Sequence, residues 1–239
     1  MLCQFTVKNF KSIRDEVTFD MQAAAISEHE DRIIIDKDEE KYLPVSAIYG
    51  PNGGGKSNVL AALHTLVAKV LRPLFATEDS EEKVLLQKKI IVEPFAFSES
   101  KDEPTEFELF FRTTVSEYRY ILHVKRDIVL YESLDRVKLE TGRKSALFTR
   151  DENGIILKGA FAKLKVSDEL SKTLTLLSYL GIAYKGNAVV KDVLSWFEYG
   201  IEFLNYGNPI QELRMAVSTS EEVKQLMLQM IQEMDLDIV

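Results

Sequence analysis

The segment Gly50-Pro51-Asn52-Gly53-Gly54-Gly55-Lys56-Ser57 governs how the rest of this chain is interpreted. An apolar run at residues 45–49 comes directly before it and predicts a short buried strand. After it, apolar residues three and four positions apart predict an amphipathic helix over residues 59–71 that ends before Pro73. Strand, glycine-rich loop and helix in this order form a phosphate-binding loop, because main-chain N–H groups and a helix N-terminus can then surround an anion. We therefore expect an α/β fold built around this loop.

The residue types in the loop suit a nucleoside triphosphate with magnesium. Glycine leaves room for the main chain to wrap the β-phosphate, and it adopts positive φ angles that other residues resist. Lys56 would bring a cation to the β- and γ-phosphates, which makes it the candidate catalytic residue. The Ser57 hydroxyl would bind Mg²⁺ at the first turn of the helix. The sequence predicts ATP and Mg²⁺ as cofactors, held by Gly50, Pro51, Asn52, Gly53, Gly54, Gly55, Lys56, Ser57 and Asn58.

Composition limits the other classes of function. The chain has 239 residues and a net charge of −8, so its overall field would repel nucleic acid. This net charge does not exclude a local basic face. A single cysteine, Cys3, excludes an internal disulfide, and with three scattered histidines it gives no zinc-binding spacing. No run approaches the roughly 20 apolar residues of a membrane span, and the N-terminus lacks the pattern of a signal peptide. We expect a cytoplasmic protein that makes no contact with a membrane.

Strand patterns lie on both sides of the loop and its helix. Alternating apolar residues predict paired strands at residues 2–10 and 17–21, and residues 33–35 are expected in a loop or a short edge strand. Beyond the helix, an antiparallel meander is expected between residues 90 and 157, with strands at residues 90–92, 107–112, 118–124, 128–130 and 146–149.

Helical spacing returns after residue 167. A helix capped at Gly181 is predicted by Leu170, Leu174, Leu177 and Leu180. Another is predicted at residues 189–197 before Gly200, and a capping box of Ser218 and Glu221 predicts the start of a last one. The whole chain then divides into a nucleotide-binding core at residues 1–89, an antiparallel part of the same lobe at residues 90–160, and a helical segment at residues 161–239.

Two strings of sequence resemble a known lineage of ATPases. The string from Gly50 to Asn58 resembles the Walker A loop of ABC-type ATPases of the RecF and chromosome-maintenance (SMC) lineage. The string Val7-Lys8-Asn9-Phe10-Lys11-Ser12-Ile13 is similar to the opening of those proteins. The resemblance implies an ABC-ATPase-like N-terminal lobe in which Lys11 and Ser12 lie beside the phosphate loop and near the nucleotide. The alternative for these two residues is a simple turn between two strands.

Within that lineage, the chain most resembles bacterial AAA-like ATPases related to overcoming-lysogenisation-defect (OLD) nucleases, several of which act in phage defence or abortive infection. The matching strings are Pro94-Phe95, Tyr118-Arg119-Tyr120, Glu132-Ser133-Leu134 and Leu147-Phe148-Thr149-Arg150. Their order extends the resemblance over nearly the whole chain. Each string by itself is also compatible with ordinary strand packing.

The acidic half of an ATPase site is not found in this sequence. Hydrolysis needs a carboxylate in the magnesium shell and a group that activates water, and the resembling family supplies both after four apolar residues. Ile33-Ile34-Ile35-Asp36 has part of that pattern, but it precedes the phosphate loop and is interpreted as a surface strand. Gln87 is not assigned as a Q-loop residue, and no ABC signature segment is found. We therefore expect this chain to be an N-terminal portion whose second lobe is absent.

The sequence favours the ATP- and Mg²⁺-binding lobe of an ABC-type ATPase. The resemblance implies a homodimer through ATP-sandwiched heads, coupled to an effector protein, a nuclease or a nucleic acid. Two alternatives stay open: a non-catalytic ATP-binding module that regulates or scaffolds, and a P-loop phosphotransferase.

Overall fold

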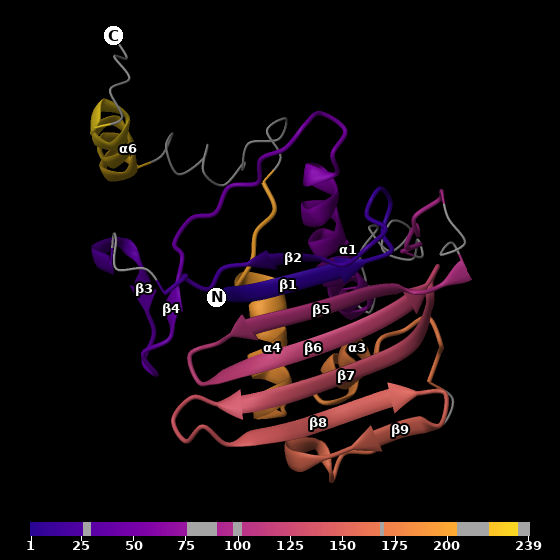
Figure 1. Ribbon diagram of the computed structural model, residues 1–239. Helices are drawn as coiled ribbons and strands as arrows, with labels where there is room; N and C mark the ends of the chain where they lie inside the picture. The colour runs from indigo at the N-terminus through magenta and orange to yellow at the C-terminus, as the bar shows by residue number, and fades with distance from the viewer. Residues whose placement is uncertain (26–29, 76–89, 98–101, 168–169, 205–219, 234–239) are drawn as a thin grey trace. The chain divides into compact units, whose positions relative to one another are not determined.

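The computed structural model describes residues 1–25, 30–75, 90–97, 102–167, 170–204 and 220–233 (Figure 1). The chain forms two compact units, Met1–Ile201 and Glu202–Val239. In its described residues, the first unit contains the phosphate loop, the sheet and three α-helices, so the parts predicted at residues 1–89 and 90–160 share one sheet.

A seven-stranded sheet forms the first unit, in the order β2-β1-β5-β6-β7-β8-β9, and every neighbouring pair is antiparallel. Its strands are β1 (Leu2–Lys8), β2 (Val17–Asp20), β5 (Thr105–Arg112), β6 (Ser116–Lys125), β7 (Ile128–Lys138), β8 (Lys144–Asp151) and β9 (Gly154–Leu157). A separate hairpin pairs β3 (Ile34–Ile35) with β4 (Lys41–Tyr42). The mixed α/β fold with its antiparallel sheet agrees with the fold class expected from the sequence.

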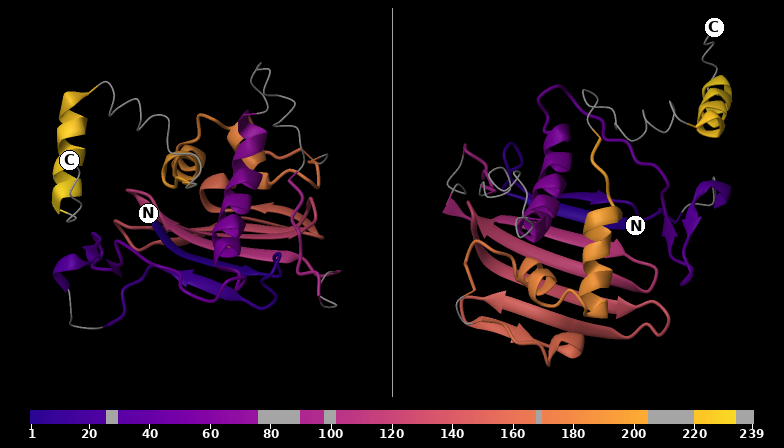
Figure 2. Two further views of the ribbon diagram at one scale, coloured as in Figure 1. Left: turned by 90° about the horizontal axis from the view of Figure 1, so that it is seen from above. Right: turned by 180° about the vertical axis from the view of Figure 1, so that it is seen from behind.

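Three helices cover one face of this sheet: α1 (Lys56–Phe75), α3 (Leu176–Ala183) and α4 (Ala188–Tyr199) (Figure 2). Side chains on β6 alternate in burial, and Tyr118, Tyr120, Leu122 and Val124 are fully buried. The Phe111 ring on β5 stacks on Trp196 of α4, with the ring centroids 4.5 Å apart. Burying each such side chain stabilises the fold by about 1.5–3 kcal/mol, so the core lies between the sheet and the helices.

Among the described helices, α1 is the one whose length and composition would allow it to cross a membrane. Its apolar stripe is part of the core instead, because Ala62, Leu63, Leu66 and Val70 are buried. The predicted end before Pro73 is wrong, since α1 continues through that proline to Phe75. Pro73 has no N–H to donate and its ring crowds the carbonyl of Lys69, which agrees with the helix ending two residues later.

Two predicted strands do not form. Residues 45–49 have no regular secondary structure and are exposed, with Val45 78% and Tyr49 90% accessible, and no described strand pairs with them. Residues 90–92 are anchored by single main-chain hydrogen bonds, such as Val92 N–H to the Arg126 carbonyl at 2.7 Å. A strand needs a ladder of such bonds, so an apolar run without a neighbouring strand stays irregular.

The predicted helix cap at Gly181 is also wrong. Thr175 caps α3 through its hydroxyl, which accepts a hydrogen bond from the Ser178 N–H, and Gly181 lies inside the helix. A Cβ at Gly181 would lie 2.5 Å from Leu194 and 2.7 Å from Leu74, so glycine permits close packing of α3 against α4 and α1. Helix α4 ends at Gly200 as predicted.

The second unit contains α6 (Glu221–Glu233). Ser220 begins this helix, and its hydroxyl accepts a hydrogen bond from the Val223 N–H at 3.3 Å. The predicted cap, Ser218, lies outside the described residues.

Candidate phosphate-binding site

The glycine-rich loop leads directly into the N-terminus of α1. Gly53 and Gly55 have φ angles of 78° and 84°, which residues with a Cβ rarely adopt. The loop turns through two main-chain hydrogen bonds, from Gly54 N–H to the Pro51 carbonyl and from Asn58 N–H to the Gly55 carbonyl. The first turn of α1 contains no acidic residue, so no carboxylate opposes the positive end of the helix dipole. This arrangement can bind an anion.

Lys56 closes the loop. Its Nζ donates hydrogen bonds to the carbonyl oxygens of Gly50 at 2.7 Å and Pro51 at 2.8 Å. The lysine predicted to meet the phosphates is thus held over the loop by two neutral acceptors. Phosphate oxygens are stronger acceptors for an ammonium group, so a bound triphosphate would compete well for this cation.

Ser57, the predicted Mg²⁺ ligand, lies in the first turn of α1 and is exposed. The residues present fit a nucleotide with its metal: a glycine loop at a helix N-terminus, the Lys56 cation over that loop and the exposed Ser57 hydroxyl. When bound, Mg²⁺ would neutralise phosphate charge. Among the described residues, no three histidine, cysteine, aspartate or glutamate side chains gather to hold a metal ion.

A tight turn at residues 9–14 lies against the phosphate loop. Phe10 and Ile13 exchange main-chain hydrogen bonds, which places Lys11 and Ser12 at the tip. Asn58 Nδ2 donates to Ser12 Oγ at 2.7 Å, and a Cβ built on Gly55 would lie 2.9 Å from the same oxygen. The structure therefore brings Ser12 to the loop, as the resemblance implies, and it also shows the turn that was the alternative.

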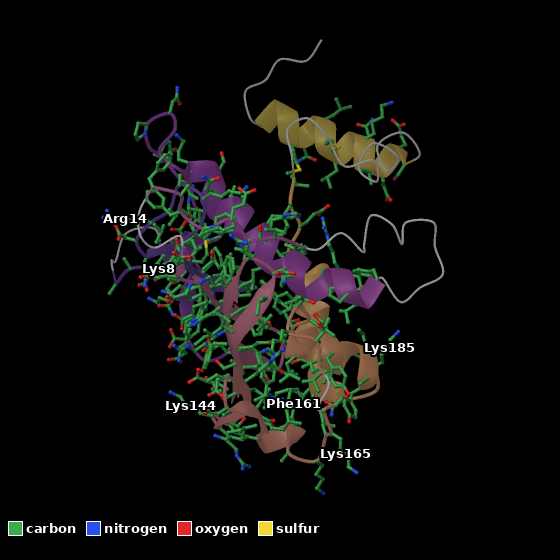
Figure 3. All side chains as sticks on the ribbon, turned by 90° about the vertical axis from the view of Figure 1, so that its right-hand side faces the viewer. Lys8, Arg14, Lys144, Phe161, Lys165 and Lys185 are labelled. Atoms are coloured by element: carbon green, nitrogen blue, oxygen red, sulfur yellow. The ribbon has the colours of Figure 1, made fainter. Side chains whose placement is uncertain are left out.

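Lys11 belongs to the same turn. Its Nζ lies 5.5 Å from the centre of the Phe10 ring, and its main-chain N–H donates to the Glu93 carbonyl. Contact of Lys11 or Ser12 with a nucleotide stays a prediction. Figure 3 labels Lys8 and Arg14, which lie at the two ends of this turn.

Asn9 anchors this turn, a role that the sequence analysis missed. Asn9 is fully buried, and its Nδ2 donates to the carbonyls of Glu103 and Pro104. Its Oδ1 accepts a hydrogen bond from Phe95 N–H at 3.0 Å, and Thr105 donates its hydroxyl to the Asn9 carbonyl. Two strings that carry the family resemblance, one around Phe10 and one around Phe95, therefore meet through one asparagine.

The three other strings converge on a buried carboxylate. Glu132 on β7 is fully buried and accepts hydrogen bonds from the Tyr120 hydroxyl at 2.9 Å and from the main-chain N–H groups of Leu176 at 2.6 Å and Leu177 at 2.9 Å. Arg150 Nη1 lies 3.9 Å from the Glu132 carboxylate and donates to the Leu174 carbonyl. Burial raises the pKa of Glu132 above its ordinary value. Burial also raises the pKa of Tyr120 well above the ordinary value of a tyrosine.

This cluster fixes α3 on the sheet and supports the helix of the phosphate loop. The two N–H groups that donate hydrogen bonds to Glu132 lie in the first turn of α3. Ser178 of α3 then donates its hydroxyl to the Val70 carbonyl of α1 at 2.7 Å. Strand packing alone would not need a buried carboxylate at this place, so the three strings have a shared structural role.

Two of the Asp-Glu pairs in the described chain lie at turns between strands. Asp38 and Glu39 are in the turn between β3 and β4, and Asp151 and Glu152 lie at the turn between β8 and β9. Asp36, which follows the three isoleucines, makes an ion pair with Arg112 at 3.0 Å on the exposed hairpin, as expected of a surface strand. Gln87 and the pair at residues 168–169 lie outside the described residues.

The sequence was also compared with known protein families. A family model described as "AAA domain, putative AbiEii toxin, Type IV TA system" matches residues 45–204. The match covers more than half of the chain and runs from just before the phosphate loop to beyond α4. No curated protein matches the chain in sequence.

Proposed function

Because the chain belongs to this family of AAA domains, we propose that it binds ATP with Mg²⁺ through residues 50–57 and uses the binding energy to associate with a second copy. The coarser conclusion follows from the family itself: the chain is a nucleotide-binding, P-loop ATPase-like module. Binding of ATP in particular, association into a dimer and the partners of that dimer are what we propose beyond the family.

One observation carries the proposal of ATP binding. Two positive-φ glycines open the loop at the start of a 20-residue helix, and the Lys56 amine already reaches over it. Main-chain amides, a helix dipole and a cation then act on the same small volume, which suits a polyphosphate better than a single carboxylate.

The resemblance to RecF, SMC and OLD-related ATPases supports the proposed coupling. In that lineage ATP lies between two heads, so its binding energy goes into association and closure rather than into small-molecule chemistry. We propose that the resulting dimer controls an effector protein, a nuclease or a nucleic acid in bacterial defence or DNA maintenance.

A second candidate is an ATP-binding module that regulates or scaffolds without turnover. The partners of three carboxylates favour this candidate. Asp36 and Asp38 form ion pairs with Arg112, and Glu132 is buried in a structural cluster. This candidate predicts binding and association with no release of phosphate.

Sedimentation velocity and phosphate release test the proposal together. The full chain is measured without nucleotide, with ATP and Mg²⁺, and with the slowly hydrolysed analogue ATPγS and Mg²⁺. We expect a dimer only with nucleotide, and a monomer in every condition for Lys56→Ala. Lys144→Ala, an exposed lysine on β8, is the matched control and should behave as the unaltered chain.

The outcomes separate the candidates. Phosphate release from ATP excludes the regulatory module, whereas binding without any dimer refutes the proposed coupling and leaves ATP binding intact. Phosphate transfer to an added small molecule would show a phosphotransferase instead.

A further inference from the structure

A surface groove lies where the C-terminal end of α1 meets α3 and α4 (Figure 2). Its volume is about 290 Å³, and all three helices contribute nonpolar residues to its lining: Leu74, Phe75, Gly181, Val190 and Leu194. Phe75 is 39% exposed, and Tyr199, which also lines the groove, is 79% exposed. An apolar groove flanked by exposed aromatic rings is typical of a surface that binds another protein.

One end of the groove is positively charged. Lys185 and Lys191 line it, and neither side chain makes an ion pair with a described residue. Lys191 lies in the first turn of α4, so the positive end of that helix dipole adds to the charge of the two lysines. Residues 170–191 contain no acidic residue.

The acidic residues of α4 do not neutralise this end. Glu198 also lines the groove, but it lies about two turns further along α4 than Lys191, and its carboxylate accepts a hydrogen bond from the Tyr199 hydroxyl at 2.8 Å. Asp192 accepts hydrogen bonds from Thr113 and Tyr118 on the sheet and is not part of the groove lining.

Lys165 extends the positive charge beyond the groove. Its main-chain N–H donates to the Tyr184 hydroxyl oxygen at 2.8 Å, and its carbonyl accepts from the same hydroxyl at 2.7 Å. Tyr184 directly precedes Lys185, and Figure 3 shows Lys165 and Lys185 at the outer surface of this part of the molecule. Residues 153–191 contain six lysines against two acidic residues, a net charge of +4 in a chain whose total is −8.

We propose that this groove binds an amphipathic helix of a partner protein, with acidic residues in the first turn of that helix. The groove lies between helices, and the apolar stripe of another helix can fill it with side chains three and four positions apart. The acidic first turn lies over Lys185 and Lys191, where opposite charges attract. The groove is at the end of α1 away from the phosphate loop, about 30 Å along this 20-residue helix, and the binding does not depend on ATP.

Fluorescence anisotropy at low salt tests this with the full chain and a fluorescein-labelled helical peptide, Ser-Glu-Glu-Leu-Ala-Gln-Leu-Leu-Ala-Gln-Leu-Ala-Gln-Leu. We expect saturable binding that weakens at least about tenfold in the double variant Lys185→Glu, Lys191→Glu. The matched control is Lys144→Glu, Lys158→Glu, which changes the net charge equally at two exposed lysines that do not line the groove, and its affinity should be unchanged. Thermal unfolding confirms that both variants are folded.

Two altered peptides test the two parts of the contact. A peptide with Lys-Lys in place of Glu-Glu should bind the Lys185→Glu, Lys191→Glu variant at least about tenfold more tightly than the unaltered chain. A peptide of the original composition in scrambled order has no apolar stripe and should not saturate the chain.

Four results would overturn the proposal. They are equal binding of the scrambled peptide, equal weakening by the two double variants, a nucleotide-free dimer that Lys185→Glu, Lys191→Glu converts to a monomer, and tighter binding of a single-stranded oligonucleotide that displaces the peptide. The third would identify a second copy of this chain as the occupant, and the fourth would identify a nucleic acid.

Discussion

Substituting Gly55 with alanine probes the contact between the phosphate loop and the turn at residues 9–14. Gly55 has a φ of 84°, and its added Cβ would lie 2.9 Å from Ser12 Oγ, where ordinary contact begins near 3.4 Å. Gly53 has a similar φ of 78°, but a Cβ there meets nothing within 4 Å. Gly53→Ala is therefore a matched control that carries the backbone cost without the contact.

The expected magnitude follows from two separate costs. The free loop of an alanine variant is expected to relax out of positive φ, and returning it to the binding conformation costs about 1–2 kcal/mol, which weakens binding roughly 5- to 30-fold. Returning the Gly55→Ala loop to that conformation also displaces Ser12 from Asn58, and the hydrogen bond lost there adds about 0.5–1.5 kcal/mol. Gly55→Ala should therefore bind ATP about 2- to 12-fold more weakly than Gly53→Ala.

Isothermal titration calorimetry with ATP and Mg²⁺ measures these affinities, and thermal unfolding confirms that each variant is folded. Adding Ser12→Ala to Gly55→Ala removes the crowded hydroxyl and should reduce the extra loss, whereas adding it to Gly53→Ala should not. Equal affinities for the two glycine variants, with no effect of Ser12→Ala on the difference, would show that the turn does not act on the loop.

Three further predictions concern the buried cluster, the hairpin and the metal. Glu132→Ala should lower the free energy of unfolding by about 3–5 kcal/mol in urea titrations, because Arg150 loses its ion-pair partner and the Tyr120 hydroxyl and two helix N–H groups lose their acceptor. A loss below about 1 kcal/mol would contradict that role. Arg112 holds the pKa of Asp38 below its ordinary value, so the stability that this pair contributes is present above about pH 4 and is lost as the pH falls through the lower folded pKa. Asp38→Asn should flatten this acid side of the stability curve, and an unchanged curve would exclude the ion pair as its cause. Ser57→Ala should reduce the gain in ATP affinity that Mg²⁺ gives over EDTA by about tenfold, and an unaltered gain would remove Ser57 as a metal ligand.

Local patterns predicted the elements whose partners are close in sequence. The alternation at residues 118–124 is β6, and the three- and four-residue spacing after the loop is α1. Antiparallel neighbours joined by short turns, such as β6 and β7, need only such local information.

The remaining features depend on contacts that no local pattern records. Residues 45–49 have the composition of a strand, but a strand forms only where a neighbour completes its ladder. Gly181 looked like a cap because glycine often ends a helix, whereas here its missing side chain makes room for Leu74 and Leu194.

The candidate site also has parts that the sequence predicts and parts that it does not. The glycine-rich loop and the places of Lys56 and Ser57 at the start of the helix could be predicted, since the motif that defines them consists of consecutive residues. The closeness of Ser12 to Gly55 came from family resemblance, because the two residues are 43 positions apart in the sequence. The buried role of Glu132 was not predictable, since a glutamate in a strand is usually exposed and its burial depends on Tyr120, Arg150 and α3.

Calorimetric titration of the full chain and of Lys56→Ala with ATP and Mg²⁺ bears most directly on the phosphate site. We expect one saturable binding event per chain, weakened by roughly 10- to 100-fold or more in Lys56→Ala with an unchanged melting temperature, because charge-assisted hydrogen bonds to phosphate are lost. A folded chain that gives no saturable heat, or a Lys56→Ala variant that binds ATP as tightly as the unaltered chain, would contradict the assignment of residues 50–57 to phosphate binding.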